Sequence, residues 1–324
     1  MGSNFKILAG KVLWFMGLIG GIASCETLVG IVPEERVGLS EPQLVVHSYI
    51  SPSDTLIKVI VSQTSPVFSN LIESRPLDDA DVRLRNGSIE VRLTFDEGLQ
   101  AYIISTKDFV AVQAGQTYHL KVTRGDNVVS ASTTVPLAPP PIHSYKIDTS
   151  YSSGGLFSDY DTTLAVRFTW KDLPGVGHYY RTSGRALIEL AYREIDQLGN
   201  VVNKVGRAWV PLTWERSLGR RDIQSDINED GSIMESPLGR VNLRRPRFVD
   251  GVDREYADKP LSVISITLDL LLTDEPYYRY HRSIEQNEDA ADNPFAEPSL
   301  PYSNLQGGLG VFASFNSFSI DIKP

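Results

Sequence analysis

Short segments in which apolar and polar residues alternate recur along most of this 324-residue chain. Residues 56–63 (LIKVIVSQ) are rich in β-branched side chains, and Val82 and Leu84 alternate with arginines. The Asn86-Gly87 pair that follows is a strong hairpin signal, because both turn positions need positive φ. Successive side chains of a strand point to opposite faces, so each apolar face needs a second layer to cover it. The pattern therefore predicts a mainly β fold built from packed sheets.

The spacing of these segments predicts a first domain over residues 43–135. Strand signals recur every 8–12 residues, as in an immunoglobulin-like β-sandwich. Tyr118 lies in the expected penultimate strand, where it either packs in the core or forms a hydrogen bond like that of a tyrosine corner. Residues 128–135 are the expected last strand. Four of the six residues 136–141 (PLAPPP) are proline, which predicts a stiff linker.

Residues 142–324 are predicted to form a second β-rich, sandwich-like domain. Apolar alternation predicts strands over 186–192, 201–210 and 261–272, and two more over 310–318 and 319–322. The fold class expected is thus mainly β, with two tandem β-sandwich-like domains and one short helix in the second.

The helix is expected directly after the strand that ends at Leu272. Acids and an early proline in Thr273-Asp274-Glu275-Pro276 suit a helix start. Tyr277, Tyr280 and Ile284 then lie on one helical face. We expect this face to pack on a sheet rather than to present a platform for an aromatic ligand.

The N-terminus predicts a lipoprotein signal peptide over residues 1–24. Two lysines precede an apolar run of 13 residues, 12–24, which is too short to span a bilayer but suits a signal-peptide core. Small residues then lead to Cys25, the chain's only cysteine. We expect Cys25 to be acylated and residues 25–42 to form a tether. The alternatives are an ordinary secretory signal or a short membrane anchor.

Composition excludes several functions. Acidic residues outnumber basic ones by 40 to 31, so the net charge of −9 argues against a nucleic-acid partner. One cysteine allows neither a disulfide framework nor a CxxC metal or redox motif.

Catalytic motifs of local spacing are absent from the sequence. The five histidines form no HxH or HExxH pattern, and no GxSxG is present. We therefore expect a non-enzymatic protein that requires no cofactor, and a hydrolase with a site assembled from distant residues is the less favoured alternative.

One segment resembles part of a calcium-binding loop. Asp226, Asn228 and Asp230 occupy alternate positions ahead of Gly231, as hard oxygen ligands do around Ca²⁺. The position where a bidentate glutamate belongs is Pro237. The sequence thus suggests a weak calcium site at these three residues, with a polar hairpin turn as the alternative.

The C-terminal segment 293–312 (NPFAEPSLPYSNLQGGLGVF) combines aromatic residues with glycines. A strand rather than a helix follows the glycines, which argues against phosphate binding and favours a loop that crosses close to another backbone. Phe295, Tyr302 and Phe312 are candidate partner contacts on this segment, and burial in the core is the alternative for each.

These motifs resemble a Bacteroidota lipoprotein family, "domain of unknown function 4249". The resemblance spans the mature chain, from the segment around Cys25 through Phe168-x-Trp170-x-Asp172 and Tyr277-Tyr278-x-Tyr280 to NPFAEP, YSN and GGLGVF. It implies an outer-membrane lipoprotein that assists a TonB-dependent β-barrel receptor in uptake, on a membrane face left undecided. It transfers no catalytic residues. A stand-alone glycan-binding or adhesion module, with Trp209 and Trp214 as candidate aromatics, is the alternative function.

Overall fold

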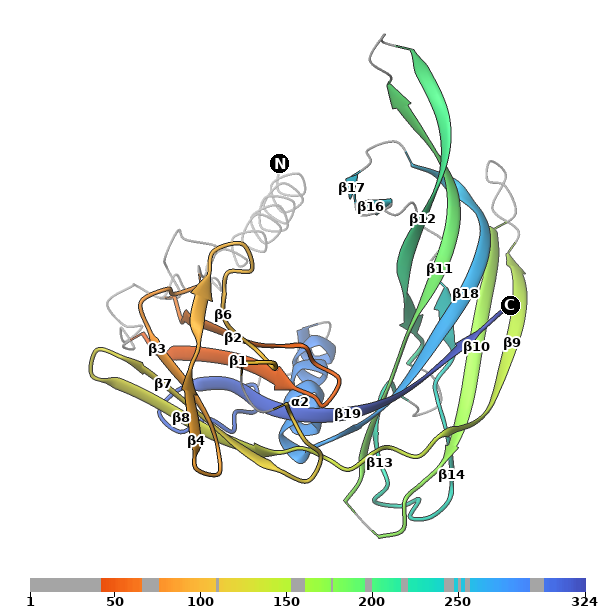
Figure 1. Ribbon diagram of the computed structural model, residues 1–324. Coiled ribbons are helices and arrows are strands. Elements are labelled where there is room, and N and C mark those ends of the chain that lie inside the picture. The colour runs from red at the N-terminus through yellow and green to blue at the C-terminus, as the bar shows by residue number, and fades with distance from the viewer. Residues whose placement is uncertain are drawn as a thin grey trace, which may run out of the picture. The chain divides into compact units, whose positions relative to one another are not determined.

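Strands dominate the residues that the computed structural model describes, as Figure 1 shows. These residues are 42–65, 76–108, 111–152, 161–175, 177–195, 200–216, 221–241, 248–249, 252–253, 257–291 and 300–324. The first eight strands are β1 (Leu44–Ile50), β2 (Leu56–Gln63), β3 (Asp81–Asn86), β4 (Ile89–Arg92), β5 (Thr94–Asp96), β6 (Ala101–Ser105), β7 (Thr117–Arg124) and β8 (Asn127–Thr134).

The later elements include the helix that the sequence predicts. They are β9 (Ile142–Ser152), β10 (Asp161–Lys171), β11 (Tyr179–Ile195), β12 (Val201–Trp214), β13 (Ile223–Ser225), β14 (Ile233–Glu235), β15 (Gly239–Val241), β16 (Phe248–Val249), β17 (Val252–Asp253), β18 (Ala257–Thr273), α2 (Glu275–Ala291) and β19 (Leu309–Ile322). The mainly β, sandwich-like fold class is confirmed. The helix has 17 residues, so it is longer than the short helix expected.

The described strands form two main sheets. One has the order β14-β10-β15-β12-β11-β18-β19-β1-β2-β6-β5, with β13 paired to β11 and β9 paired to β10. The second has the order β4-β3-β7-β8, and β16 pairs separately with β17. A β3–β4 hairpin forms where the sequence predicts one, but its two turn residues are Gly87 and Ser88, because Asn86 pairs with Ile89 as the last residue of β3. Gly87 has φ 56°, whereas Asn86 does not have the positive φ expected for it.

An N-terminal core forms between the β1-β2-β6-β5 part of the large sheet and the β4-β3-β7-β8 sheet. Its fully buried side chains come from both layers, with Val46 and Val59 on one and Leu84 and Val122 on the other. Tyr118 is completely buried there, and its hydroxyl accepts the Gln113 N–H at 2.9 Å. Tyr118 thus combines the two roles weighed for it from the sequence.

The C-terminal strand β19 belongs to both cores. Its first half pairs in parallel with β1, from Val45↔Leu309 to Ile50↔Ser314, and its second half pairs antiparallel with β18. Phe312 is buried in the N-terminal core and Ile322 in the core formed by β10–β12 and β18. The sequence predicted two strands here, whereas the structure has one continuous strand. The predicted domain limits remain predictions, and this shared strand was not foreseen.

Glycines let the chain approach β1 and β8 closely just before and within β19. A Cβ atom added to Gly307 would overlap the carbonyl oxygen of Val128, and one on Gly310 would overlap that of Val46. Gly310 also has φ 108°, a backbone angle that residues with a side chain rarely adopt. The close backbone approach predicted for this segment is therefore confirmed.

Helix α2 begins at a buried junction around Asp274. The Tyr277 N–H donates to Asp274 Oδ1 at 2.9 Å, as in an N-cap, and Asp274 Oδ2 accepts the hydroxyls of Thr133 on β8 and Ser314 on β19. The Asp274 N–H also donates to Ser314 O at 3.0 Å. One carboxylate therefore joins the helix to strands from both halves of the chain.

The tyrosine face of α2 packs as the sequence predicts. Tyr277 is buried with Val311 and Ala313 of β19, and Tyr280 is partly buried against the same cluster. The alternative of an exposed aromatic platform on this face is therefore wrong.

We predict that Gly310→Ala destabilises the protein by about 3 kcal/mol or more, because the added methyl group overpacks the β1–β19 contact and φ is unfavourable. Urea unfolding measures the effect. Gly125→Ala is the matched control, since Gly125 also has positive φ but no atom lies within 4 Å of its added Cβ. Equal losses in the two variants would contradict a steric requirement at Gly310.

A second prediction concerns the pH dependence of stability. Burial raises the pKa of Asp274 from 3.8 to about 6, against the opposing effect of its hydrogen bonds. Because the folded pKa lies above the unfolded one, the stabilising contribution is complete below about pH 4 and is lost as pH rises through 6. Wild type should therefore lose roughly 2–3 kcal/mol relative to Asp274→Asn between pH 4 and pH 7, measured by urea unfolding.

Asp274→Ala separates the charge from the cap in the same experiment. It leaves the Tyr277 N–H without its side-chain acceptor, so it should be less stable than Asp274→Asn at every pH. A difference between wild type and Asp274→Asn that stays constant with pH would refute the raised pKa.

Candidate functional site

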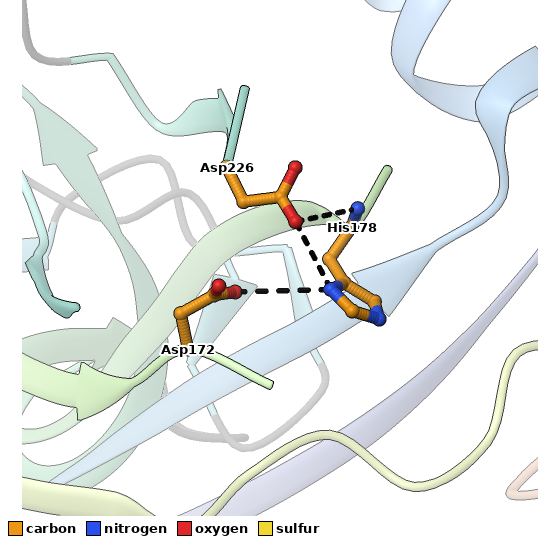
Figure 2. A group of neighbouring side chains, drawn as sticks. All are labelled: Asp172, His178 and Asp226. Carbon is orange, nitrogen blue, oxygen red and sulfur yellow. Dashed lines mark hydrogen bonds and ion pairs between the residues drawn. The ribbon is translucent and has the colours of Figure 1, made fainter. Parts of the chain in front are cut away.

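Two loops meet at a group of three side chains, drawn in Figure 2. Asp172 directly follows β10, His178 directly precedes β11, and Asp226 directly follows β13. The antiparallel pairing of β11 with β13 begins at Tyr179↔Ser225, and the Asp226 N–H continues it by donating to His178 O at 3.1 Å. The sheet register therefore places His178 opposite Asp226.

The imidazole of His178 faces both carboxylates. Its Nδ1 lies 3.0 Å from Asp226 Oδ2 and 4.0 Å from Asp172 Oδ1. The two carboxylate side chains have no exposed surface, whereas 25% of the His178 side chain is exposed. Solvent thus reaches this group only on the histidine side.

Each carboxylate oxygen also accepts a hydrogen bond from a backbone N–H or a hydroxyl group. Asp226 accepts the N–H groups of Gly177 and His178, each at 3.0 Å, through Oδ1 and Oδ2 respectively. Asp172 Oδ1 accepts the Tyr180 hydroxyl and Oδ2 accepts the Gly231 N–H, both at 2.8 Å. These bonds fix the orientation of both carboxylates and close the two loops on each other.

Glycines shape both loops at this point. Gly175 and Gly177 have φ near 100°, and Gly231 has φ 66°. Positive φ at these positions turns the backbone N–H groups toward the aspartates.

The three residues predicted to bind calcium do not form one group with each other. Asp226 lies with Asp172 and His178, whereas Asp230 Oδ1 accepts the Gly175 N–H at 2.9 Å and Asn228 is exposed. The Gly231 N–H donates to Asp172 on the facing loop. The segment is a turn that braces the 172–178 loop, and calcium binding by these residues stays a prediction.

The candidate partner contacts have different outcomes. Phe312 has no exposed surface and belongs to the N-terminal core, so its assignment as a contact residue is wrong. Its position is set by the β1–β19 pairing, which turns the side chain inward. Tyr302 is half-buried, with the Arg279 guanidinium 4.2 Å from its ring centre. Phe295 and Cys25 lie outside the described residues.

Sequence reasoning did not identify Asp172 and His178 as members of a site. Asp172 was noted only within the Phe168-x-Trp170-x-Asp172 pattern, and His178 has no ligand-like neighbour at regular spacing. Asp226 lies 48 residues beyond His178, so only the strand pairing brings them together. The one sequence signal was the pair of glycines, Gly175 and Gly177, shortly before His178.

A second polar group lies beneath α2. Arg181 donates to the Tyr277 hydroxyl at 2.7 Å and lies 3.6 Å from Asp222. Burial, assisted by the Arg181 charge, lowers the pKa of His281 to about 4, and burial raises the pKa of Tyr49. The Tyr49 and His281 rings stack on each other, and the partly buried Arg181 lies over the Tyr277 ring, which attaches the helix to the sheet.

The outer face of the β11–β12 hairpin carries exposed apolar side chains. Val201 and Val205 are 64% and 59% exposed, and Trp209 is 50% exposed with the Arg185 guanidinium 4.6 Å from its ring centre. Trp214 instead packs against Phe168 and the core. Of the two tryptophans considered from the sequence, only Trp209 presents a surface to a ligand.

The fold and this group of residues define a mainly β, sandwich-like protein with a buried aspartate–histidine–aspartate cluster. The chain belongs to the family described as a domain of unknown function, DUF4249, whose model matches residues 31–321. The family membership inferred from the sequence motifs is therefore confirmed. No curated protein matches the chain. In the described part of the chain, no helix is long and apolar enough to cross a membrane.

Proposed function

We propose that this chain is an outer-membrane-anchored lipoprotein that assists a TonB-dependent transport complex and catalyses no reaction of its own. The observation that carries the proposal is the apolar run 12–24, which ends in small residues and the only cysteine of the chain. Acylation of Cys25 would attach the β body to the membrane. The resemblance of the sequence motifs to an outer-membrane lipoprotein family supports this role.

The arrangement of polar groups favours binding over catalysis. The carboxylates of Asp172 and Asp226 are engaged with backbone N–H groups, and Arg181 is engaged with Tyr277 and Asp222. Side chains held in this way stabilise loops and a helix. A partner would then be recognised by surface residues on a rigid scaffold.

The β11–β12 hairpin is our candidate for that surface. Val201, Val205 and Trp209 lie four residues apart on the same face of β12, and all are at least half exposed. Clustered exposed apolar side chains commonly mark protein interfaces, and tryptophan is enriched among the residues that dominate binding energy. We propose that this face, in place of Phe312, contacts the barrel.

A glycan-binding role is the second candidate, and the surroundings of Trp209 favour it. The adjacent sheet surface has a depression of about 410 Å³ beside Arg185. It is lined by Ser183, Gly184, Arg185, Asp269, Leu271, Phe315 and Ser317. An exposed indole ring next to hydroxyl, carboxylate and guanidinium groups offers both the stacking surface and the hydrogen bonds that sugars require.

Membrane attachment is tested with Cys25→Ala. The variant should move from the membrane fraction to the soluble or unprocessed fraction, and mass spectrometry of the wild-type mature N-terminus should show an acylated cysteine. Retention of Cys25→Ala in the membrane would contradict the anchor. Cross-linking of wild type in cells, followed by detergent extraction, should recover a β-barrel receptor, and failure to recover one would contradict the accessory role.

Trp209→Ala separates the two candidate functions. If the hairpin contacts a barrel, the variant should reduce co-purification of the barrel at least about 30-fold, as loss of a dominant interface residue does. If Trp209 binds sugar, a glycan array should lose its signal while barrel recovery is unchanged. Val128→Ala on β8, which removes a side chain 48% exposed, is the control. Both variants should melt like wild type, and unchanged binding in both assays would exclude Trp209 from either function.

A further inference from the structure

The side chains of Asp172, His178 and Asp226 each direct one ligand-type atom toward a common point (Figure 2). His178 Nδ1, one oxygen of Asp172 and one oxygen of Asp226 all lie within 4.8 Å of one another. Metal–ligand bonds of about 2.0–2.2 Å bridge atoms at such spacings after small side-chain shifts. We propose that these three residues bind one divalent transition-metal ion, and that Zn²⁺ suits the donor set.

The local charge supports a cation at this point. Both aspartate side chains are fully buried, and in the described part of the chain His178 is their only ion-pair partner. Burying a carboxylate is costly unless it is paired with a positive charge or coordinates a metal. A neutral imidazole leaves two negative charges uncompensated, and a divalent ion balances both.

The groups around the three residues match the outer shell of a metal site. Each proposed ligand oxygen has one further donor, which is the His178 N–H for Asp226 Oδ2 and the Tyr180 hydroxyl for Asp172 Oδ1. The other oxygen of each carboxylate accepts a glycine N–H. Hydrogen bonds of this kind orient ligating carboxylates in known metal sites.

The donor set selects the class of metal. An imidazole nitrogen with two carboxylate oxygens suits zinc and related first-row ions, whereas Ca²⁺ takes six to eight oxygen ligands. The proposal therefore differs from the calcium site suggested by the sequence, since it replaces Asn228 and Asp230 with Asp172 and His178. The exposed side of His178 leaves room for water to complete the coordination.

The competing explanation is a hydrogen-bonded clasp without metal. In that case His178 Nδ1 carries a proton and donates to Asp226 Oδ2, and the same atoms serve only to close the two loops. In the metal site, Nδ1 must instead be free of its proton. Direct metal titration distinguishes the two cases, and its result does not depend on the proposed membrane role.

Calorimetric titration of the chelator-treated full-length chain with ZnCl₂ tests the proposal. We expect saturable binding of one Zn²⁺ per chain and a rise in melting temperature with Zn²⁺ concentration. Co²⁺ in place of Zn²⁺ should give the visible absorption of a cobalt ion with a nitrogen ligand. CaCl₂ added to the protein before the Zn²⁺ titration should compete with Zn²⁺ weakly or not at all.

Variants locate the ion. Asp226→Asn and His178→Gln should each weaken Zn²⁺ binding at least about 10-fold, the lower end of losses seen even for outer-shell changes. Asp230→Asn, which alters an exposed carboxylate on the same loop, and His143→Gln, which removes an exposed histidine, should bind like wild type. Circular dichroism of the metal-free variants checks that each is folded.

Two results would overturn the proposal. One is wild-type protein that shows no saturable Zn²⁺ binding and no Co²⁺ absorption. The other is stoichiometric Zn²⁺ binding that is unchanged in folded His178→Gln, which would assign the ion to a different site. Either result leaves the group as a hydrogen-bonded clasp.

Discussion

The parallel pairing of β1 with β19 is the contact on which the rest of the described structure depends. It joins residues 264 positions apart in the sequence, and the same strand then pairs with β18. Gly310 makes the pairing sterically feasible, because any side chain there would overlap the Val46 carbonyl. As a result one strand supplies Phe312 to the first core and Ile322 to the second. The two cores are therefore joined by the backbone hydrogen bonds of one shared strand.

Buried carboxylates complete what the strand pairing begins. Asp274 connects the start of α2 to β8 and β19, and its burial raises its pKa to about 6. Asp172 and Asp226 do the same for the loops before β11 and after β13. Asp226 accepts the Gly177 N–H and Asp172 accepts the Gly231 N–H, and both glycines have positive φ. In both places a charge is buried where several donors converge. The donors orient each carboxyl group, as outer-shell hydrogen bonds do in metal sites.

Buried and exposed side chains therefore have different proposed roles in this protein. Two aromatic residues near the C-terminus are buried inside the molecule, Tyr277 against β19 and Phe312 in the N-terminal core. Exposed apolar side chains instead gather on the β11–β12 hairpin, where Trp209 stacks with Arg185. We therefore look to the hairpin for partner or sugar binding and to the Asp172–His178–Asp226 group for an ion, which makes the two proposals separable.

The sequence by itself determined the strand-rich class, the presence of a hairpin near Gly87, the start of α2 and the family. Alternation, turn chemistry and capping act over a few residues, so local patterns are enough to predict them. The GGLGVF glycines also predicted a close backbone contact, though not which strand lies against them. Only the tertiary structure decided that β19 serves two cores, that Phe312 points inward, and that Asp226 meets His178 and Asp172 rather than Asp230. Such pairings depend on strand register between segments about fifty to several hundred residues apart, and local sequence patterns carry no information about register over that distance.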